Sequence, residues 1–234
     1  MNKDTKIKEI IQDGKFFIFD ERHPVVKFLP EKTKVFGSNT APVKLCFENS
    51  LGKSIDIMYK YSDDLRQDQL IMQLISLMDY LLKGVNVDLR LTIYSILTFS
   101  PIDGIIEFVQ NSTTIQNALT KDLDGYLIQL SKKKNELLME VNPKMAGEIP
   151  PLNEIREDIY ENYKESCASY CVITYLLGIG DRHLENIMID KEGKFFHIDF
   201  GYTMGEDPKP RPPPFKLTPA MISSKLISLQ RERA

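Results

Sequence analysis

The sequence predicts an α+β protein in which a β-rich first part, up to about residue 110, is followed by a mainly helical second part. Before this point, apolar residues occur in short or alternating runs broken by Gly, Asn, Ser and Pro, a pattern typical of antiparallel strands. After it, apolar residues recur every three or four positions, which predicts amphipathic helices. With 234 residues, 42% hydrophobic and 27% charged, the chain has the size and composition of a globular protein with a packed core.

The first part is predicted to contain four strands, a helix and two more strands. The four strands occupy residues 15–19, 34–36, 42–48 and 54–60. The helix is predicted to begin at Asp64, because Gln67 stands three residues later as in a capping box, and to end at Gly84. Its expected buried stripe comprises Leu70, Leu74, Met78 and Leu81. The last two strands are predicted at residues 93–98 and 104–109.

The second part is predicted to contain two helices and then a hairpin. The first helix covers residues 123–140, and a Pro-rich break at 142–153 separates it from a long helix that ends at Gly178. The buried face of the long helix is expected to comprise Ile155, Ile159, Tyr163, Cys167, Tyr170 and Thr174. The hairpin consists of strands at 187–190 and 194–198, joined by a Lys-Glu-Gly turn.

Composition and charge exclude several classes of protein. The formal net charge of −3 provides no overall basic field, so nucleic acid is not expected as a partner. Cys46, Cys167 and Cys171 match neither a zinc site nor a disulfide framework, which indicates a reduced, intracellular chain. The first residues lack the apolar core of a signal peptide, and no stretch approaches eighteen consecutive apolar residues. The chain is therefore expected in the cytoplasm, free or peripheral on a membrane.

Two polar loops are predicted at the ends of the hairpin strands. One, Gly-Asp-Arg-His-Leu-Glu-Asn, covers residues 180–186, and the other begins with Asp-Phe-Gly at Asp199. The hairpin should place Asn186 and Asp199 side by side, where an amide and a carboxylate oxygen can share Mg²⁺ with nucleotide phosphates. The step of five residues from Asp181 to Asn186 and the Asp-Phe-Gly triad both match protein-kinase catalytic segments, which indicates phosphoryl transfer.

The order Asp-Arg-His in the first loop, where protein kinases have His-Arg-Asp, resembles the phosphoinositide-kinase superfamily. Three long segments, at 59–79, 166–186 and 197–217, are similar to phosphoinositide 3-kinases. The last segment, with its Asp-Pro-Lys-Pro and Pro-Pro-Pro sequences, is most similar to the class III, vacuolar-sorting type. The resemblance runs from about residue 22 to residue 222.

The resemblance implies a bilobal protein-kinase-like fold with a β-rich N-lobe and a helical C-lobe. Residues 1–21 are then an N-terminal extension, and residues 22–234 are the catalytic domain. Its N-lobe covers about 22–110 and its C-lobe about 111–234. Because family members continue into further helices, the C-lobe is expected to be incomplete and to leave apolar surface uncovered.

The resemblance also implies residues that contact the nucleotide phosphates. Lys60 would reach the phosphates, and Asp68 would help to orient that region as the helix Glu of protein kinases does. Without the family context, Lys60 is equally compatible with an exposed lysine of an edge strand. Ser38 would belong to the loop that covers the phosphates, where backbone N–H groups can bind oxygens; on its own this loop is compatible with a plain hairpin turn.

For the adenine base, the resemblance implies backbone hydrogen bonds from the segment between the lobes. Backbone groups of Glu107 and Val109 would bond the adenine edge, although an apolar strand has the same sequence pattern. Tyr94 would either close the nucleotide pocket or simply fill the core.

For catalysis, the resemblance implies that residues 180–186 are the catalytic loop, whose side chains contact the reacting groups. His183 is the preferred acceptor of the substrate hydroxyl proton, because an ordinary histidine titrates near the working pH. Asp181 is the alternative, either as acceptor or as an orienting group. Arg182 is placed with the catalytic loop as a structural clamp, for which a packing salt bridge is the expected interaction. Asn186 and Asp199 are the expected metal ligands.

The lipid substrate is expected to lie against residues 201–217. This segment carries the cations Lys209, Arg211 and Lys216, opposed by two acidic residues, and it is rich in proline. Arg211 departs from the class III pattern, which is usually apolar at this position.

The predicted function is therefore ATP- and Mg²⁺-dependent phosphorylation of the 3-hydroxyl of phosphatidylinositol, with Mn²⁺ as an alternative metal. The resemblance further implies action on endosomal or autophagic membranes as a peripheral protein, with a protein-kinase-like regulatory subunit. The alternative is a truncated kinase-like module with weak or no activity that acts by binding nucleotide or a partner. A protein Ser/Thr kinase of the same superfamily is disfavoured by the lipid-kinase character of the Pro-rich segment.

Overall fold

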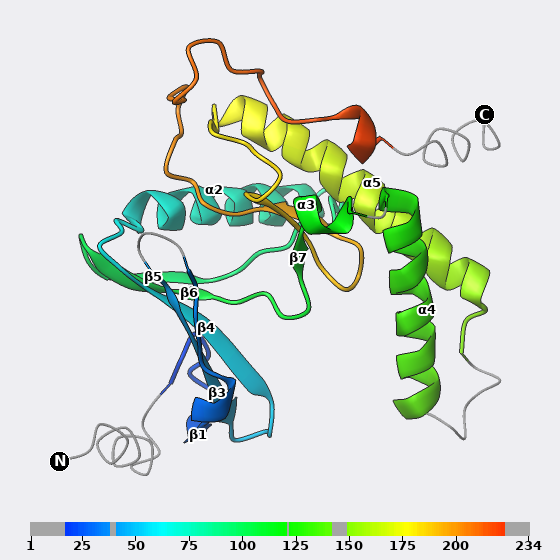
Figure 1. The fold of residues 1–234 in the computed structure, drawn as a ribbon, viewed down its shortest axis with the longest axis horizontal. Coiled ribbons are helices and arrows are strands. Elements are labelled where there is room, and N and C mark those ends of the chain that lie inside the picture. The colour runs from blue at the N-terminus through cyan, green and yellow to red at the C-terminus, as the bar shows by residue number, and fades with distance from the viewer. Residues whose placement is uncertain (1–16, 38–40, 121, 142–148, 223–234) are drawn as a thin grey trace. The chain divides into compact units, whose positions relative to one another are not determined.

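The computed structural model describes residues 17–37, 41–120, 122–141 and 149–222, which form two compact units (Figure 1). The first unit comprises the chain up to Leu74 together with Ile93–Gln110. The second comprises Ile75–Thr92 and the chain from Asn111 onward. The predicted β-rich and helical parts are thus both present, and the predicted α+β class is confirmed.

The first unit is built on an antiparallel sheet with the strand order β1-β3-β4-β6-β5, and β2 pairs with β3 beside this path. The strands are β1 (Val25–Phe28), β2 (Lys34–Val35), β3 (Val43–Asn49), β4 (Ser54–Tyr61), β5 (Ile96–Ser100) and β6 (Asp103–Glu107), and a short 3₁₀ helix, η1 (Pro30–Lys32), follows β1. The core under the sheet consists of Ile18, Val25, Phe47, Ile57 and Ile105. Alternating side chains of neighbouring strands therefore meet on one face, as expected for a half-buried sheet.

Five of the six predicted strands are found, with ends displaced by a few residues. The strand predicted at 15–19 is wrong over its described part, because residues 17–19 form no ladder and Phe19 has a left-handed φ of 60°. Its apolar character has another cause, since Ile18 is buried in the core. Strand β1 was not predicted, because it is short and directly follows Pro24.

Helix α2 (Arg66–Lys83) occurs where the sequence predicts a helix, and Asp64 accepts a hydrogen bond from the Arg66 N–H at its start. The predicted buried stripe is wrong, because Leu70 and Leu81 are 51% and 58% exposed. The buried side chains of the helix belong to the adjacent stripe and include Ile71, Met72 and Ile75. Both stripes repeat with helical spacing, so periodicity alone cannot choose between them.

The second unit contains a three-stranded sheet and most of the helices. The strands, in the order β7-β8-β9, are β7 (Thr113–Thr114), β8 (Ile187–Ile189) and β9 (Phe195–His197). The helices are α3 (Ile115–Ala118), α4 (Leu123–Val141), α5 (Leu152–Leu176) and the 3₁₀ helix η3 (Pro219–Met221). The predicted hairpin is β8–β9, whereas β7 and α3 are too short to have been recognised from the sequence. The part of the predicted Pro-rich break at 142–148 lies outside the described residues.

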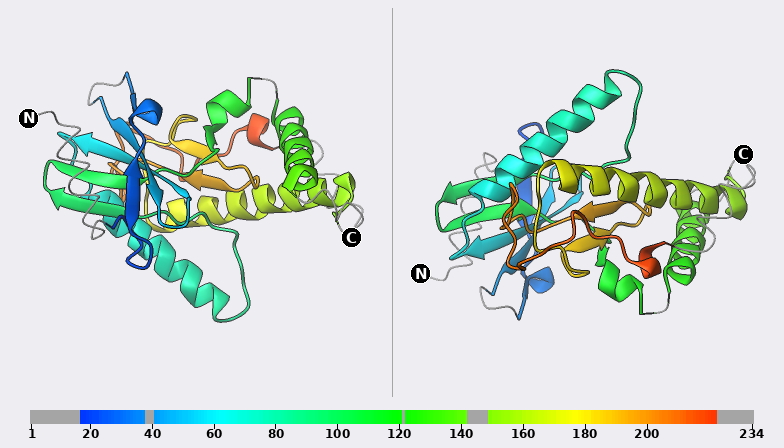
Figure 2. Two further views of the ribbon diagram at one scale, coloured as in Figure 1. Left: turned by 90° about the horizontal axis from the view of Figure 1, so that it is seen from below. Right: turned by 90° about the horizontal axis from the view of Figure 1, so that it is seen from above.

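Helix α5 lies along the β8–β9 hairpin and supports it (Figure 2). All six residues predicted for its inner face are buried. The Tyr163 ring meets Phe195 edge to face at 6.0 Å, and the Tyr170 ring stacks on His197 at 5.1 Å. The Ser166 hydroxyl also accepts the Phe195 N–H at 2.8 Å. Such aromatic and hydrogen-bonded contacts fix the hairpin, and the loops at its end, to the long helix.

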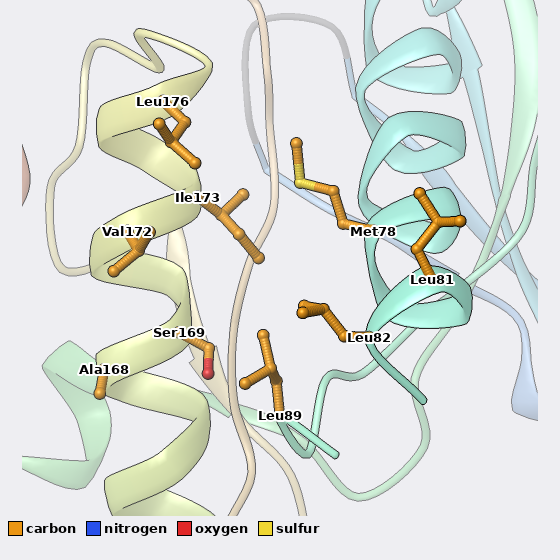
Figure 3. A pocket seen from close by; sticks show the side chains of 9 residues that line it. All are labelled: Met78, Leu81, Leu82, Leu89, Ala168, Ser169, Val172, Ile173 and Leu176. Atoms are coloured by element: carbon orange, nitrogen blue, oxygen red, sulfur yellow. The ribbon is translucent and has the colours of Figure 1, made fainter. Parts of the chain in front are cut away.

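An apolar groove of about 640 Å³ lies in the second unit, between the end of α2 and the last turns of α5 (Figure 3). It is lined by Met78, Leu81, Leu82, Leu89, Ala168, Ser169, Val172, Ile173 and Leu176. Val172 and Leu176 are 57% and 64% exposed. The groove therefore presents apolar surface on the described part of the helical unit. None of the helices in the described ranges is long and apolar enough to cross a bilayer.

Candidate active site

The two polar loops meet at one end of the β8–β9 hairpin. Ile187 and His197 are register partners, and beyond this pair the Ile198 N–H donates to the Asn186 carbonyl oxygen at 3.0 Å. Asp199 directly follows Ile198. Asn186, the residue before β8, and Asp199, the second residue after β9, are therefore neighbours. The predicted juxtaposition of Asn186 and Asp199 is therefore found.

The Asn186 side chain is held in place by the catalytic loop. It is buried, and its amide nitrogen donates to the Asp181 carbonyl oxygen at 3.1 Å. The Asn186 N–H donates to the His183 carbonyl oxygen at 3.0 Å, which closes the loop into a tight turn. With its nitrogen engaged, the Asn186 amide has its oxygen left as the atom that suits a hard metal ion.

Asp181 and Asp199 both adopt a left-handed backbone conformation, with φ values of 50° and 62°. For a residue with a Cβ atom this conformation costs about 1–2 kcal/mol, so the surrounding contacts must hold it. The Asp181 N–H donates to the Asp207 carboxylate at 2.7 Å. The Asp199 carbonyl oxygen accepts a hydrogen bond from Arg182. The Asp199 side chain is exposed.

Arg182 is a buried clamp that connects the two loops. Its guanidinium donates to the carbonyl oxygens of Gly180 at 2.7 Å and Ile198 at 2.8 Å, in addition to that of Asp199. The planar fork of an arginine can serve several acceptors at once, and these acceptors lie on both loops. The clamp expected from the sequence is found, and it acts through carbonyl oxygens.

The charge of Arg182 also affects His197, which lies fully buried beside it. Burial lowers the pKa of His197 well below its ordinary value of 6.5, and the positive charge of Arg182 lowers it further. His197 is therefore neutral at physiological pH. Its ring, stacked on Tyr170, forms part of the support beneath the loops.

His183 and Asp181, the two predicted proton acceptors, lie on the same turn with partly exposed side chains. The backbone of each is fixed, because the His183 carbonyl oxygen accepts from Asn186 and the Asp181 N–H is bonded to Asp207. The geometry is compatible with either residue as the acceptor.

The predicted phosphate-binding residues lie in the first unit. Lys60, at the end of β4, has its ammonium group 2.8 Å from the Asp63 carboxylate, and its side chain is 15% exposed. Asp68 lies in the first turn of α2 and is buried. The Lys60–Asp63 ion pair was not predicted, although the acidic Asp63 and Asp64 directly follow the strand. Ser38 lies outside the described residues.

The predicted adenine-binding segment follows directly from β6. The Glu107 N–H donates to the Ser95 carbonyl oxygen at 2.8 Å, and the Glu107 carboxylate accepts the Ser95 N–H at 2.9 Å. An adenine contact at Glu107 therefore has to use its carbonyl oxygen. Val109 is half-buried, two residues beyond the strand. Tyr94 is 4% exposed, as expected for a side chain that fills the core.

Comparison with known proteins identifies the family. The model of the family described as phosphatidylinositol 3- and 4-kinase matches residues 54–232, which is more than half of the chain. The chain belongs to the phosphatidylinositol 3- and 4-kinase family. Its predicted metal and catalytic residues, and also Lys60 and Asp68, all lie within the matched range.

Individual relatives are similar to this kinase-family chain over most of its length. Phosphatidylinositol 3-kinase VPS34 of Saccharomyces cerevisiae is 45% identical over 197 residues, which are 83% of this chain and 21% of the yeast protein. Phosphatidylinositol 3-kinase pik3 of Schizosaccharomyces pombe is 38% identical over 235 residues, 95% of this chain and 28% of that protein. The root isoform of phosphatidylinositol 3-kinase from Glycine max is 38% identical over 200 residues, 86% of this chain and 23% of that protein.

These relatives confirm the resemblance to the class III, vacuolar-sorting type. The chain spans between 21% and 28% of the length of these three relatives. The kinase-family fold is thus established for this chain, whereas the activity of the much longer relatives is carried to it only as a proposal.

The residues at the end of the hairpin fit the divalent metal ion that a kinase family implies. Asp199 offers an exposed carboxylate and Asn186 an amide oxygen, the hard ligands that Mg²⁺ and Mn²⁺ prefer. Within the described ranges there is no cluster of three or more His, Cys, Asp or Glu residues arranged to hold a metal. A magnesium ion that keeps several waters and binds nucleotide phosphates needs only one or two protein ligands.

The predicted lipid-facing cations lie on a segment without helix or strand. Lys209 and Arg211 are exposed, and Lys216 is half-buried. Asp207 in this segment and Gly180 in the loop at 180–186, neither of which the sequence marked as functional, make contacts that attach the segment to that loop. The Asp-Pro sequence at 207–208, a typical turn start, was the available signal for Asp207.

Proposed function

We propose that this chain is the catalytic region of a phosphatidylinositol 3-kinase, which transfers the γ-phosphoryl group of ATP to the 3-hydroxyl of phosphatidylinositol. The observation that carries the proposal is the hairpin end, where Asn186 and Asp199 are neighbours and Arg182 joins their loops, in a chain of the phosphatidylinositol 3- and 4-kinase family. The relatives are named phosphatidylinositol 3-kinases, which supports the lipid as the substrate.

In the proposed reaction, the 3-hydroxyl oxygen attacks the γ-phosphorus, ADP leaves, and His183 or Asp181 takes the hydroxyl proton. Both acceptors are carried on a loop whose backbone is fixed by hydrogen bonds, which is what positioning of the reacting groups requires. The metal, when bound by Asn186 and Asp199, would neutralise charge on the nucleotide phosphates.

The proposed nucleotide contacts come from the first unit. Lys60 would bind the phosphates and Asp68 would orient that part of the lobe, while the loop containing Ser38 would cover them. The Glu107 carbonyl oxygen and a backbone group of Val109 would bond the adenine edge, with Tyr94 against the base. Residues 22–234 would then form the catalytic domain and residues 1–21 an extension.

The proposed substrate preference is for phosphatidylinositol over its phosphorylated forms. Each additional headgroup phosphate adds roughly 1.5–2 negative charges that need cationic partners. Lys209, Arg211 and Lys216 are opposed by two acidic residues in the same segment, so its net charge is only +1. One phosphodiester can be balanced by this charge, but further phosphates cannot. We place the activity on endosomal or autophagic membranes, with a protein-kinase-like regulatory subunit as the partner.

The metal site is tested by nucleotide-induced thermal stabilisation, with and without Mg²⁺. A ligand at one hundred times its Kd adds about 2.7 kcal/mol of stability, which corresponds to roughly 5–11 °C in melting temperature for a chain of this size. We expect the Mg²⁺-dependent part of this shift to disappear in Asp199→Asn. The control is Asp158→Asn, which makes the same change at an exposed position of α5. Equal shifts in wild type and Asp199→Asn would exclude the metal site.

The reaction is tested by phosphoryl transfer to vesicles that contain phosphatidylinositol, its 4-phosphate or its 4,5-bisphosphate. We expect product from phosphatidylinositol, with slower transfer to the other two lipids. Mg²⁺-ATP binding without transfer to any lipid would favour the alternative, a nucleotide-binding module. A rate on the bisphosphate equal to that on phosphatidylinositol would contradict the proposed preference.

A further inference from the structure

The chain passes twice through the same place beside the catalytic loop. Residues 177–181, which lead into that loop, run alongside residues 202–207, which follow the Asp-Phe-Gly triad. Three backbone hydrogen bonds of 2.9 Å join the two segments: Met204 N–H to the Leu177 carbonyl, Gly205 N–H to Gly178, and Gly180 N–H to Tyr202. The first residues of the predicted lipid-facing segment are thus attached to the catalytic loop.

The two segments approach so closely that Gly180 cannot carry a side chain. A Cβ atom at this position would lie 2.2 Å from the Glu206 carbonyl oxygen and 2.9 Å from the Asp207 carboxylate. Both distances are far below a van der Waals contact. Only glycine, which has no Cβ atom, therefore allows residues 206 and 207 to lie this close to position 180.

Asp207 ends the paired stretch, where its carboxylate accepts two hydrogen bonds. One oxygen accepts the Asp181 N–H at 2.7 Å, and the other accepts the Lys209 N–H at 2.8 Å. The first bond holds Asp181, whose φ is 50°, at the start of the catalytic loop. The second forms a turn of the type that aspartate favours before proline, at the point where the Pro-rich segment begins.

We propose that Asp207 is a positioning residue that sets the catalytic loop and the lipid-facing segment in a fixed register. The proposal rests on the proposed function, because it assigns the segment beyond Asp207 to the lipid. One carboxylate holds the backbone of Asp181, a candidate proton acceptor, and also directs the chain that carries Lys209 and Arg211. The lipid headgroup and the acceptor would therefore be positioned by the same side chain.

This role explains why an acidic residue stands next to cations that should face an anionic lipid. A free carboxylate there would repel the headgroup phosphate. Both oxygens of Asp207 instead accept backbone N–H groups, and such charge-assisted hydrogen bonds are strong. The neighbouring Glu206 is exposed, and in the described part of the chain no hydrogen bond or ion pair of its carboxylate is found.

The first test measures amide hydrogen exchange in the whole chain by mass spectrometry, in peptides that cover residues 178–183. We expect Asp207→Ala to accelerate exchange in these peptides by about tenfold or more, because a bond to a charged acceptor is lost. Glu206→Ala removes the same charge from the adjacent position and should leave exchange as in wild type. Asp207→Asn has one acceptor oxygen instead of two and should give an intermediate rate. Unchanged exchange in Asp207→Ala would overturn the proposal.

Where Asp207→Ala fails to fold, as judged by circular dichroism, Asp207→Asn takes its place in the same comparison with Glu206→Gln. Exchange in Asp207→Asn that equals the Glu206→Gln control would then overturn the proposal. Because this readout needs no substrate, it decides the role of Asp207 even if the wild-type chain phosphorylates no lipid, an outcome that would contradict the proposed function alone.

The second test separates positioning from general destabilisation by steady-state kinetics. Misplacement of a substrate segment by about 1 Å can reduce a rate by about a hundredfold, so we expect Asp207→Ala to raise KM for phosphatidylinositol and lower kcat. KM for ATP should not change, because the nucleotide contacts are proposed for other residues. Equal changes in KM for lipid and for ATP would indicate a general structural defect and overturn the positioning role.

Discussion

Arg182→Lys should destabilise the protein by far more than a conservative exchange usually does. The lysine keeps the positive charge but loses the planar fork that reaches the carbonyl oxygens of Gly180, Ile198 and Asp199. An ammonium group at the end of a flexible stem can serve one of these acceptors well but not all three. Because Arg182 is only 6% exposed, water cannot replace the lost donors.

The magnitude follows from the number of bonds lost. A hydrogen bond to a charged group contributes about 1.5–3 kcal/mol, and such contributions are not additive, so the loss of one or two gives about 2–4 kcal/mol. For a chain of this size, 1 kcal/mol shifts the melting temperature by about 2–4 °C, so the expected decrease is roughly 4–16 °C. Since the lost bonds hold the backbone next to Asp199, the Mg²⁺-dependent stabilisation by ATP should decrease as well.

The assay is thermal unfolding of wild type, Arg182→Lys and a matched control. Arg66→Lys makes the same exchange at a residue whose side chain is 62% exposed and pairs with Asp64. Surface ion pairs contribute little, so the control should melt as wild type does. If Arg182→Lys and Arg66→Lys melt at the same temperature, the interpretation of Arg182 as the clamp between the loops is wrong.

Three further predictions follow from buried or crowded residues. His197 is neutral in the folded state, whereas an unfolded histidine protonates near pH 6.5. Below that pH the unfolded state therefore binds more protons than the folded state. The free energy of unfolding should fall by up to about 1.4 kcal/mol per pH unit on acidification from pH 6.5 to 5.5. His197→Gln should remove this slope in unfolding experiments, and an unchanged slope would exclude His197 as its source. Gly180→Ala should lower the melting temperature and accelerate proteolysis of residues 201–217, because its Cβ atom would meet the Glu206 carbonyl oxygen at 2.2 Å; a protein as stable as wild type would contradict the observed packing. Val172→Asp with Leu176→Asp should reduce binding of a hydrophobic dye to the apolar groove without a large change in melting temperature, and equal dye binding would show that the groove is not the exposed apolar surface.

Much of the candidate site could be predicted because it depends on local sequence. A Lys-Glu-Gly turn between two apolar runs specifies a hairpin over residues 187–198. Once this hairpin forms, Asn186 before it and Asp199 after it must be neighbours. The buried face of α5 was predicted for the same reason. The residues of this face recur every three or four positions from Ile155 to Thr174, and Asp, Glu, Lys and Arg lie elsewhere on the helix.

The predictions that were wrong concern segments whose local sequence is compatible with two different arrangements. Helix α2 carries two adjacent apolar stripes, so the helix was predicted correctly but Leu70 and Leu81 were wrongly expected to be buried. The apolar run that includes Phe17 and Ile18 satisfies the pattern of a strand, yet it inserts one side chain into the core without joining the sheet. In both cases packing against residues distant in sequence made the choice.

The sequence by itself determined the fold class, the family and the order of the candidate site residues, because these depend on periodicity and on motifs that lie within short stretches. Only the tertiary structure decided how those residues are held. The carbonyl oxygens bound by Arg182 span residues 180–199, and Asp207 reaches back twenty-six positions to Asp181. Such bonds form because two loops return to one place, and no spacing along the chain specifies which N–H or carbonyl group will be there.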